Sequence, residues 1–255
     1  MLQTLLKPTP VDPAPRKRAN MSSNLILAAL PDVDFRRWEP HLEWVDMPLG
    51  QVIVEPGTEL DYAYFPATAI VSLLYVMEDG ESAEIALVGN DGVLGVTLFM
   101  GGNSSTIRAV VQSAGMGWRL PAKALMAEVA RGGPTLRVLL LYTQSLLTQM
   151  TQTAACNRHH TLDQQFCRWL LLSFDRLAGN EMVMTQKLIA KMLGVKSEEV
   201  TATATALEAT GAIDYLDGRI QLLDRAALES ASCECYEVVR RECDRLMPKV
   251  QRRSA

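Results

Sequence analysis

Short apolar runs alternate with polar turn residues in the first half of the chain. Five runs follow one another at spacings of about 8–12 residues, and each ends in turn residues that include glycine. They read QVIVEPG, DYAYFPATAIVSLLYVMEDG, ESAEIALVGNDG, VLGVTLFMGG and TIRAVVQSAG. Pro56-Gly57, Asp79-Gly80 and Asn90-Asp91-Gly92 are signals of hairpin-type turns. The pattern predicts the strands of a compact antiparallel barrel or sandwich.

The segments on either side of these runs have the period of helices. Residues 24 to 47 predict short helices that are broken at Pro31 and Pro40. No glycine or proline interrupts residues 135 to 160, so this segment predicts one long helix. Residues at alternating spacings of four and three form a seam of about three heptads along it. This seam predicts pairing with a second copy through Leu139, Thr143, Leu146, Met150 and Thr153, and continues to Asn157 and His160.

Three further helices are predicted between residues 161 and 211. The segment TLDQQFCRWLLLSFDRLA should form the first, with Gly179 as its C-cap. Thr185 is suited to cap the second, QKLIAKML, and Gly194 to turn the chain after it. Ser197 is then suited to cap the third helix, which should end at Gly211.

The third of these helices has a clear apolar face and is followed by a hairpin. Val200, Ala204 and Leu207 recur at helical spacing and should be buried. The segment AIDYLDGRIQLLD then predicts two strands around Asp217-Gly218. A last helix should run from Asp224 to about residue 245. Two short helices joined by a glycine turn, with a hairpin behind them, are typical of a winged helix-turn-helix.

Composition and charge narrow the class of protein. Apolar residues make up 48% of the 255 residues, which is enough for a well-stocked core. The net charge of −4 means that no global basic field draws the protein to nucleic acid, so any DNA contact must be local. No apolar run is long enough to cross a bilayer, and Leu2 to Leu6 are too short for the core of a signal peptide. We therefore expect a cytoplasmic protein with no membrane partner.

The cysteines predict neither disulfides nor a metal site. There are five of them, an odd number, which favours reduced thiols: Cys156, Cys167, Cys233, Cys235 and Cys243. Cys233, Cys235 and Cys243 offer three thiolates, whereas a closed zinc site has four ligands. His159 and His160 are adjacent on a helix, where side chains diverge by about 100°, so we expect His160 in the seam and His159 on the surface. The expectation is free structural cysteines, with no cofactor and no metal.

Enzyme chemistry finds little support in the sequence. A metal-dependent barrel enzyme would need several histidines on facing strands, and His41 is the only histidine before residue 159. Neither a Gly-x-Ser-x-Gly elbow nor a phosphate-binding loop occurs. We expect no catalytic residues.

Several motifs occur together and in order. EPGTELDYAYFP, LVGNDGVLG, ACNRHHTLDQQFCRWLL and MTQKLIAKMLGVKSEEVTATATALEATGAIDYLDGRIQLLDRAALESASCECY resemble the CRP/FNR family of bacterial transcription regulators, and the resemblance covers nearly everything after residue 23. It implies an α+β protein with a cupin-like antiparallel β-barrel of the cyclic-nucleotide-binding type, a long dimerisation helix and a C-terminal winged helix-turn-helix. Its partners would be DNA, a second copy of itself and a small-molecule effector.

The expected domain bounds follow from these patterns. They are a disordered tail at 1–23, a β-roll sensor domain at 24–135, a dimerisation helix at 136–160, a winged helix-turn-helix at 161–230, and a C-terminal helix and tail at 231–255.

The sensor departs from relatives that bind cyclic nucleotides. In these relatives a Gly-Glu pair binds the ribose and an Arg-Ala segment binds the phosphate. The long helix contributes a pair of residues with hydroxyl side chains. Arg108-Ala109 resembles the phosphate segment, and Thr151 keeps half of the hydroxyl pair. The loop GVLGVTLFMGG has no glutamate, and losing such a hydrogen bond costs about 2 kcal/mol. We expect an effector other than cyclic AMP, or none, with Arg108, Ala109 and Thr151 as weak ligand-binding candidates.

The recognition helix also departs from the family. Relatives have arginines at the positions of Ser197 and Ala202 and a glutamate at that of Glu198, and only the glutamate is present here. Residues 181 to 224 have four basic and seven acidic side chains, so DNA binding should be weak. The sequence leaves open a family member that acts through a ligand or protein partner instead. The candidate DNA-contacting residues are Lys187, Lys196, Ser197, Glu198, Thr201, Ala202, Thr205 and Arg219.

Overall fold

The computed structural model describes residues 22–177 and 179–247. The predicted disordered tail therefore lies outside the described residues, apart from Ser22 and Ser23. None of the helices in the described part combines the length and apolar character that crossing a bilayer requires.

The N-terminal helices are short, as the prolines predict. Asn24 caps the first, because its side chain accepts hydrogen bonds from the amides of Ile26 and Leu27. The prediction of helices up to residue 47 is wrong for its last part, since residues 43–47 form a strand that pairs with the strand after residue 114. The helices are α2 (Leu25–Ala28), α3 (Asp32–Trp38) and the 3-10 turn η1 (Glu39–His41).

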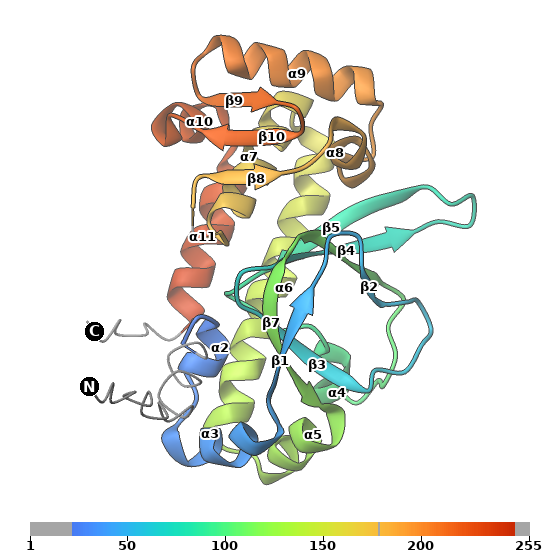
Figure 1. Cartoon of the computed structure of the whole chain (residues 1–255), viewed down its shortest axis with the longest axis vertical. Coiled ribbons are helices and arrows are strands. Elements are labelled where there is room, and N and C mark those ends of the chain that lie inside the picture. Colours follow the sequence, from blue (N-terminus) through green and yellow to red (C-terminus); the bar gives the residue numbers. More distant parts are fainter. Residues whose placement is uncertain (1–21, 178, 248–255) are drawn as a thin grey trace, which may run out of the picture.

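Two antiparallel sheets form the β-roll (Figure 1). Their strands lie in the orders β1-β7-β3 and β2-β6-β4-β5. Asp79-Gly80 forms the predicted turn between β4 and β5, with Gly80 at φ 86°. The strands are β1 (Glu43–Met47), β2 (Val52–Val54), β3 (Tyr62–Pro66), β4 (Ile70–Val76), β5 (Ser82–Val88), β6 (Arg108–Ser113) and β7 (Gly115–Pro121).

One predicted strand is a helix. The run VLGVTLFMGG contains α4 (Val96–Met100), and its flanking residues Gly95 and Gly101 have φ values of 104° and 88°. Left-handed backbone is easiest for glycine, so the two glycines that read as strand punctuation instead begin and end a single helical turn. A further helix, α5 (Ala122–Arg131), leads from β7 to the long helix.

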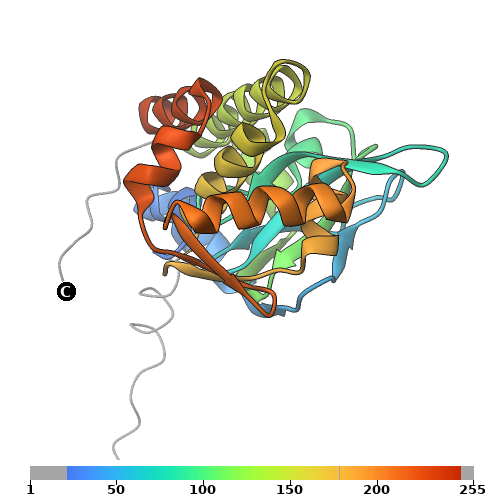
Figure 2. The same ribbon diagram turned by 90° about the horizontal axis from the view of Figure 1, so that it is seen from above.

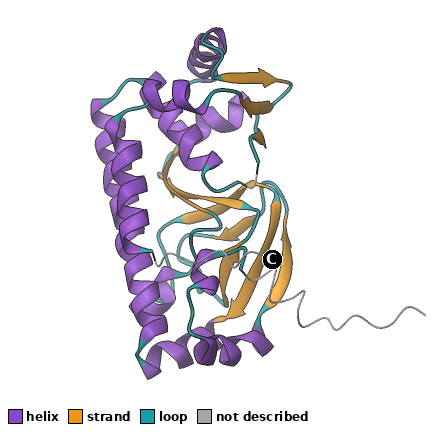
Figure 3. Ribbon diagram, turned by 90° about the vertical axis from the view of Figure 1, so that its left-hand side faces the viewer, coloured by secondary structure: helices purple, strands orange, loops and turns teal. Residues whose placement is uncertain are grey.

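The long helix α6 (Pro134–His159) spans the height of the molecule, as predicted (Figures 1 and 3). Figure 3 shows helices along one edge of the molecule and the β-roll on the other side. Apolar side chains of α6 such as Leu139 and Leu146 belong to the same core as those of the β-roll. One face of α6 is therefore already packed within the chain.

The next helix, α7 (Leu162–Phe174), ends earlier than predicted. Its capping box at Thr161 and Gln164 fixes the start. It ends at Phe174 rather than at Gly179 because the chain tightens there, with the amide of Arg176 bonding to the carbonyl of Ser173.

The remaining elements form the predicted winged helix-turn-helix. It consists of α8, α9 and a small antiparallel sheet with the strand order β8-β10-β9. The predicted last helix is in fact two helices, because the backbone is extended at Ser232 and Cys233. The elements are β8 (Glu181–Val183), α8 (Gln186–Leu193), α9 (Ser197–Ala209), β9 (Ile213–Leu216), β10 (Arg219–Leu222), α10 (Arg225–Ala231) and α11 (Glu234–Leu246).

Candidate functional site

Helices α8 and α9 form an exposed pair at one end of the molecule. The Thr185 side chain accepts a hydrogen bond from the amide of Leu188 and starts α8. Gly194, with φ 69°, turns the chain toward α9. Val200 and Ala204 are buried on the inner face of α9, as predicted. Figure 2, which looks down on this end, shows α9 lying across it with its outer side uncovered.

The cap of α9 differs from the prediction. Lys196, not Ser197, is the N-cap residue, and its amide donates a hydrogen bond of 2.9 Å to Glu199. Ser197 is the first helical residue and is half-buried. One of the two acidic residues of the first turn is therefore used by the helix itself.

Most of the predicted DNA-contacting side chains lie on the exposed surface. Around α9 they are joined by Lys191, another exposed lysine. The ion pairs of the described residues include none of Lys187, Lys191 and Lys196. Free cations of this kind are what phosphate contacts require. The exposed residues are Lys187, Lys196, Glu198, Thr201, Ala202, Thr205 and Arg219.

Two of these residues already have partners. The hydroxyl of Thr201 lies 2.8 Å from the Gln186 side chain and 2.9 Å from the carbonyl of Ser197. Arg219, on the hairpin, forms an ion pair with Glu181 of the neighbouring strand β8. Thr201 and Arg219 would each have to break this existing bond before binding DNA. Their contacts with DNA should therefore be weaker than those of the lysines.

A second site is a cavity of about 210 Å³ between the β-roll and α6. Hydroxyl groups come only from Thr97, Ser105 and Thr143, and among the described residues no charged side chain lines the cavity. Met100 and Leu147 also line it and are 62% and 55% exposed, so the cavity opens to the surface there. The apolar wall includes Val54, Leu60, Leu73, Val93, Leu94, Ile107, Leu146 and Met150.

The three ligand-binding candidates are not brought together. Ala109 lines the cavity. Arg108 precedes it on β6, so its side chain points to the other face of the sheet, where its Nε lies 2.8 Å from Glu55 Oε2. Thr151 is exposed, and its hydroxyl donates to the carbonyls of Leu147 and Thr148 in its own helix. Arginine is thus absent from the cavity wall.

The predicted dimer seam lies inside the chain. Leu139, Thr143, Leu146 and Thr153 are buried, and Met150 packs against the same core as the β-roll. These side chains pack within their own chain, because this side of the helix faces the β-roll and α7. One position further along the helix is a row of exposed residues at the same alternating spacing: Leu140, Gln144, Leu147, Thr151, Ala154 and Arg158.

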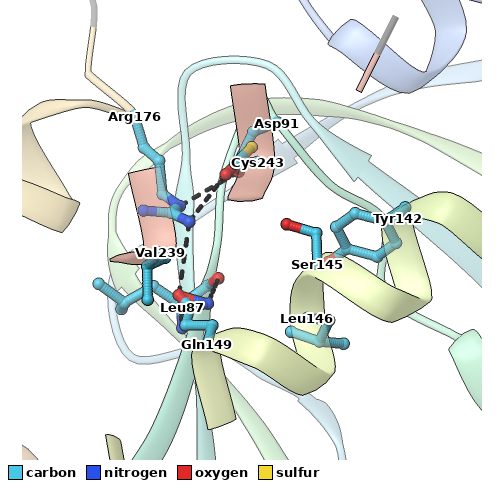
Figure 4. A pocket seen from close by; sticks show the side chains of 9 residues that line it. All are labelled: Leu87, Asp91, Tyr142, Ser145, Leu146, Gln149, Arg176, Val239 and Cys243. Carbon is cyan, nitrogen blue, oxygen red and sulfur yellow. Dashed lines mark hydrogen bonds and ion pairs between the residues drawn. The ribbon is translucent and has the colours of Figure 1, made fainter. Parts of the chain in front are cut away.

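A buried polar contact joins the β-roll to α7 (Figure 4). The guanidinium of Arg176 donates to Asp91, with Nη2 2.7 Å from Oδ2 and Nε 3.1 Å from Oδ1. Gln149 of α6 lies beside this pair and bonds to both the amide and the carbonyl of Leu87. Gly89 is required here, because a Cβ on it would lie 2.7 Å from the Cβ of Arg176. These contacts join the β-roll to α6 and to the segment that follows α7.

A second buried contact crosses the same junction. Glu84 of β5 accepts hydrogen bonds from Trp169 Nε1 of α7 at 3.0 Å and from Ser72 Oγ at 2.6 Å. Burial raises the pKa of Glu84 to about 7, although both hydrogen bonds and the charges of Arg168 and Arg176 lower it. The junction therefore contains a carboxyl group that titrates near neutral pH.

Neither junction contact is predicted from the sequence. In the sequence, Asp91 has the pattern of a turn residue and Glu84 lies within an apolar run. A signal was available for Glu84, since it alternates in phase with the buried residues Ser82 and Ala86. A carboxylate on the inward face of a strand has to have partners, but only the fold shows that Trp169 supplies one.

Comparison with known proteins agrees with this architecture. Residues 44–131 match the cyclic nucleotide-binding domain family, and residues 164–231 match the Crp-like helix-turn-helix domain family. A search of curated proteins found none that matches the chain.

Solved structures share the fold at low identity. FixK2 from Bradyrhizobium japonicum has a TM-score of 0.65 at 19% identity, over 75% of this chain and 98% of that one. A CRP/FNR-family transcriptional regulator from Thermus thermophilus has a TM-score of 0.56 at 22% identity, over 74% and 98%. The c-di-GMP responsive regulator CLP from Xanthomonas campestris has a TM-score of 0.57 at 14% identity, over 75% and 99%.

The fold and the two matched domains are those of a DNA-binding transcription regulator with an N-terminal cyclic nucleotide-binding domain. The chain belongs to the CRP/FNR family, as its motifs predicted. This is a family of transcription regulators, not of enzymes.

Proposed function

We propose that the protein is a homodimeric transcription regulator that binds DNA through α9 and responds to a small apolar effector. The observation that carries DNA binding is the exposed N-terminal half of α9. It lies at one end of the molecule beside three lysines, Lys187, Lys191 and Lys196, that form no ion pair among the described residues. A helix N-terminus in such a position can enter the major groove while the lysines contact phosphates.

The exposed face of α6 supports the dimer. Leu140 and Leu147 are 50% and 55% exposed, although both have large apolar side chains. They lie in the row that continues through Gln144, Thr151 and Ala154, whose alternating spacing is that of a coiled-coil seam. Pairing two chains along this row would cover the exposed leucines and place the two α9 helices to contact successive turns of DNA.

The apolar cavity supports an effector that is not a nucleotide. A phosphate group needs a cation or several donors, and the cavity provides three hydroxyl groups and no charge. A cavity of about 150 Å³ with apolar walls can bind benzene, so the larger cavity here suits an apolar molecule of naphthalene size. Because Leu147 belongs both to the cavity and to the proposed seam, an effector at this site would act on the dimer contact directly.

The test is fluorescence anisotropy of the purified protein with its own upstream DNA and with a scrambled duplex, at about 50 and 200 mM salt. We expect binding to the upstream DNA that weakens as salt increases, because lysine–phosphate contacts release counterions. Equal binding to both duplexes, or none at low salt with and without a cell metabolite extract, would contradict the proposal.

A second function has one observation in its favour. Helix α9 carries no arginine or lysine, and Glu198 is exposed on it without an ion-pair partner among the described residues. An acidic, cation-free helix suits a protein partner better than a phosphate backbone. For this alternative we expect a salt slope of DNA binding near zero, which the same titration measures.

A further inference from the structure

Four metal-binding side chains from distant parts of the sequence converge at the junction of α6 and α11. They are Cys156, His160, Cys233 and Cys235, and their ligand atoms all lie within 4.8 Å of one another. The Sγ atoms of Cys156 and Cys233 are 3.5 Å apart, and Cys235 Sγ lies 3.6 Å from His160 Nδ1. The three cysteines are buried, and the histidine is half-buried.

Local structure explains why these residues meet. Cys156 lies in the last turn of α6, and His160 is the C-cap residue of the same helix, one turn further on. Cys233 is the N-cap residue of α11, and Cys235 is in its first turn. The break between α10 and α11 sets this second pair beside the first. Had residues 224 to 245 formed the predicted single helix, Cys233 would not be an N-cap residue.

Two of the spacings among these four atoms are close to those of a tetrahedral site. Ligands about 2.3 Å from a central zinc ion at tetrahedral angles lie about 3.8 Å from one another. The two distances given above are close to this value, whereas a disulfide would bring two sulfur atoms to about 2.05 Å. Apolar packing of thiols explains the burial of the cysteines but does not explain a histidine nitrogen placed among the sulfur atoms.

We propose that Cys156, His160, Cys233 and Cys235 bind one zinc ion. Three thiolates and one imidazole, closed on all four sides, form a ligand set of structural zinc sites. The sequence expectation of no metal rested on Cys233, Cys235 and Cys243 as the only candidate thiolates. The fold replaces Cys243, which lies beside Arg176 in the domain junction (Figure 4), with Cys156 and His160.

The surroundings of the cluster support this assignment. His160 directs Nδ1 to the sulfur atoms, while its other nitrogen, Nε2, lies 3.2 Å from Glu234 Oε2. A metal-bound histidine usually donates its second N–H to a carboxylate in this way, which fixes the tautomer and orients the ring. Glu234 is 76% exposed, so this carboxylate has no role in the packing of the core.

A buried cation lies close to the cluster, bonded to a residue about one helical turn before Cys156. Three thiolates and a divalent ion leave one negative charge, which is costly in a buried site unless it is balanced. Arg168 is buried and donates to Thr153 at 3.0 Å, and none of the ion pairs of the described residues includes it. The arginine is therefore in place to balance the zinc–thiolate cluster.

Zinc at this position would join the end of the long helix to the start of α11. The polypeptide enters the winged helix-turn-helix at this end of α6 and passes through α11 after leaving it. A bound ion would therefore fix the base of the DNA-binding domain on α6. The proposed site depends on neither DNA binding nor dimerisation.

The test measures metal content of the full chain, purified from zinc-supplemented medium with its affinity tag removed and dialysed against a chelator. We expect one zinc per chain by atomic emission. Replacing the metal with Co²⁺ should give the intense visible bands of tetrahedral thiolate coordination. The variants Cys233→Ser and Cys235→Ser should lose the ion, while Cys167→Ser and Cys243→Ser, which change cysteines outside the cluster, should keep it.

A surface variant keeps the test informative if a cysteine variant fails to fold. Glu234→Gln removes only the exposed carboxylate next to His160, and it should weaken zinc binding about 10- to 100-fold. Glu237→Gln, three residues further along α11, is the matched control and should leave affinity unchanged. The proposal is overturned if the folded protein binds no zinc, if it binds an iron–sulfur chromophore, or if mass spectrometry finds a Cys156–Cys233 disulfide.

Discussion

Arg176 Nη2 lies 2.7 Å from Asp91 Oδ2, and this pair joins the end of α7 to the loop that follows β5. Both side chains are largely buried, at 7% and 18% exposure. Neither partner can be removed cheaply, since a buried charge without its partner is poorly solvated. The contact thus links the β-roll half of the molecule to the half that contains the winged helix-turn-helix.

The first prediction concerns this pair. Asp91→Asn keeps the shape of the side chain but leaves the charge of Arg176 without a counter-ion. We expect the free energy of unfolding to fall by about 3–5 kcal/mol, measured by urea denaturation. Glu78→Gln, in the exposed turn after β4, should change it by less than about 0.5 kcal/mol. Similar losses for both variants would show that the ion pair has no special role.

The second prediction concerns the pH dependence of stability. The pKa of Glu84 rises from 4.5 to about 7 on folding because burial disfavours its charge. The folded state therefore holds this proton more tightly than the unfolded state, and stability falls as the pH rises from about 4.5 to about 7. The loss above that range amounts to about 3 kcal/mol, at about 1.4 kcal/mol per pKa unit.

Glu84→Gln tests this directly. Glutamine keeps an acceptor for Trp169 and Ser72 but does not titrate, so the variant should be more stable than the parent at pH 8 and should approach it near pH 5. Thermal unfolding at several pH values measures the difference. Parallel curves for the two proteins would indicate that Glu84 titrates at its ordinary pKa when folded.

The third prediction concerns the dimer. Leu147→Glu puts a charge in the middle of the exposed row of α6, where pairing would bury it. We expect a monomer by light scattering at concentrations where the parent is a dimer. Leu216→Glu changes an equally exposed leucine on β9, 66% exposed, and should leave the dimer intact. A dimeric Leu147→Glu protein would exclude the exposed row as the interface.

The fourth prediction concerns the lysines around α9. Each of Lys187→Ala, Lys191→Ala and Lys196→Ala should reduce the salt slope of DNA binding by about 1, because each removes one phosphate contact. Lys123→Ala, on α5 in the sensor domain, is the control and should leave the slope unchanged. If all four variants behave alike, Lys187, Lys191 and Lys196 do not face DNA.

The fifth prediction concerns the cavity. Naphthalene should raise the thermal unfolding temperature, and cyclic AMP should not, because the cavity wall has no cation for a phosphate. Ala109→Phe would fill the cavity and abolish the effect of naphthalene. Stabilisation by cyclic AMP in the parent, lost on Arg108→Ala, would instead restore the nucleotide-binding role of that arginine.

Local patterns in the sequence were sufficient for most of the secondary structure. The spacing of turn residues predicted the antiparallel strands, and the absence of glycine and proline predicted α6. Thr185 and Gly194 marked the two ends of α8 as the structure has them. These features depend on neighbours in the chain, so they can be recognised in sequence. The predictions at α4 and at α11 are wrong because the glycines around α4 also suit a turn between strands, and because no local motif marks the extended backbone at Ser232 and Cys233.

The sequence by itself therefore determined the order and type of the elements, the apolar face of α9 and the family. The tertiary structure decided which face of α6 is covered. The rows that begin at Leu139 and at Leu140 have the same spacing in the sequence, and only the first of them packs against the β-roll. It also decided the partners of Asp91, Glu84 and Cys156, which lie on other elements. Contacts between residues far apart in the chain depend on how whole elements pack, and that packing is set by the summed burial of many apolar side chains rather than by any local motif.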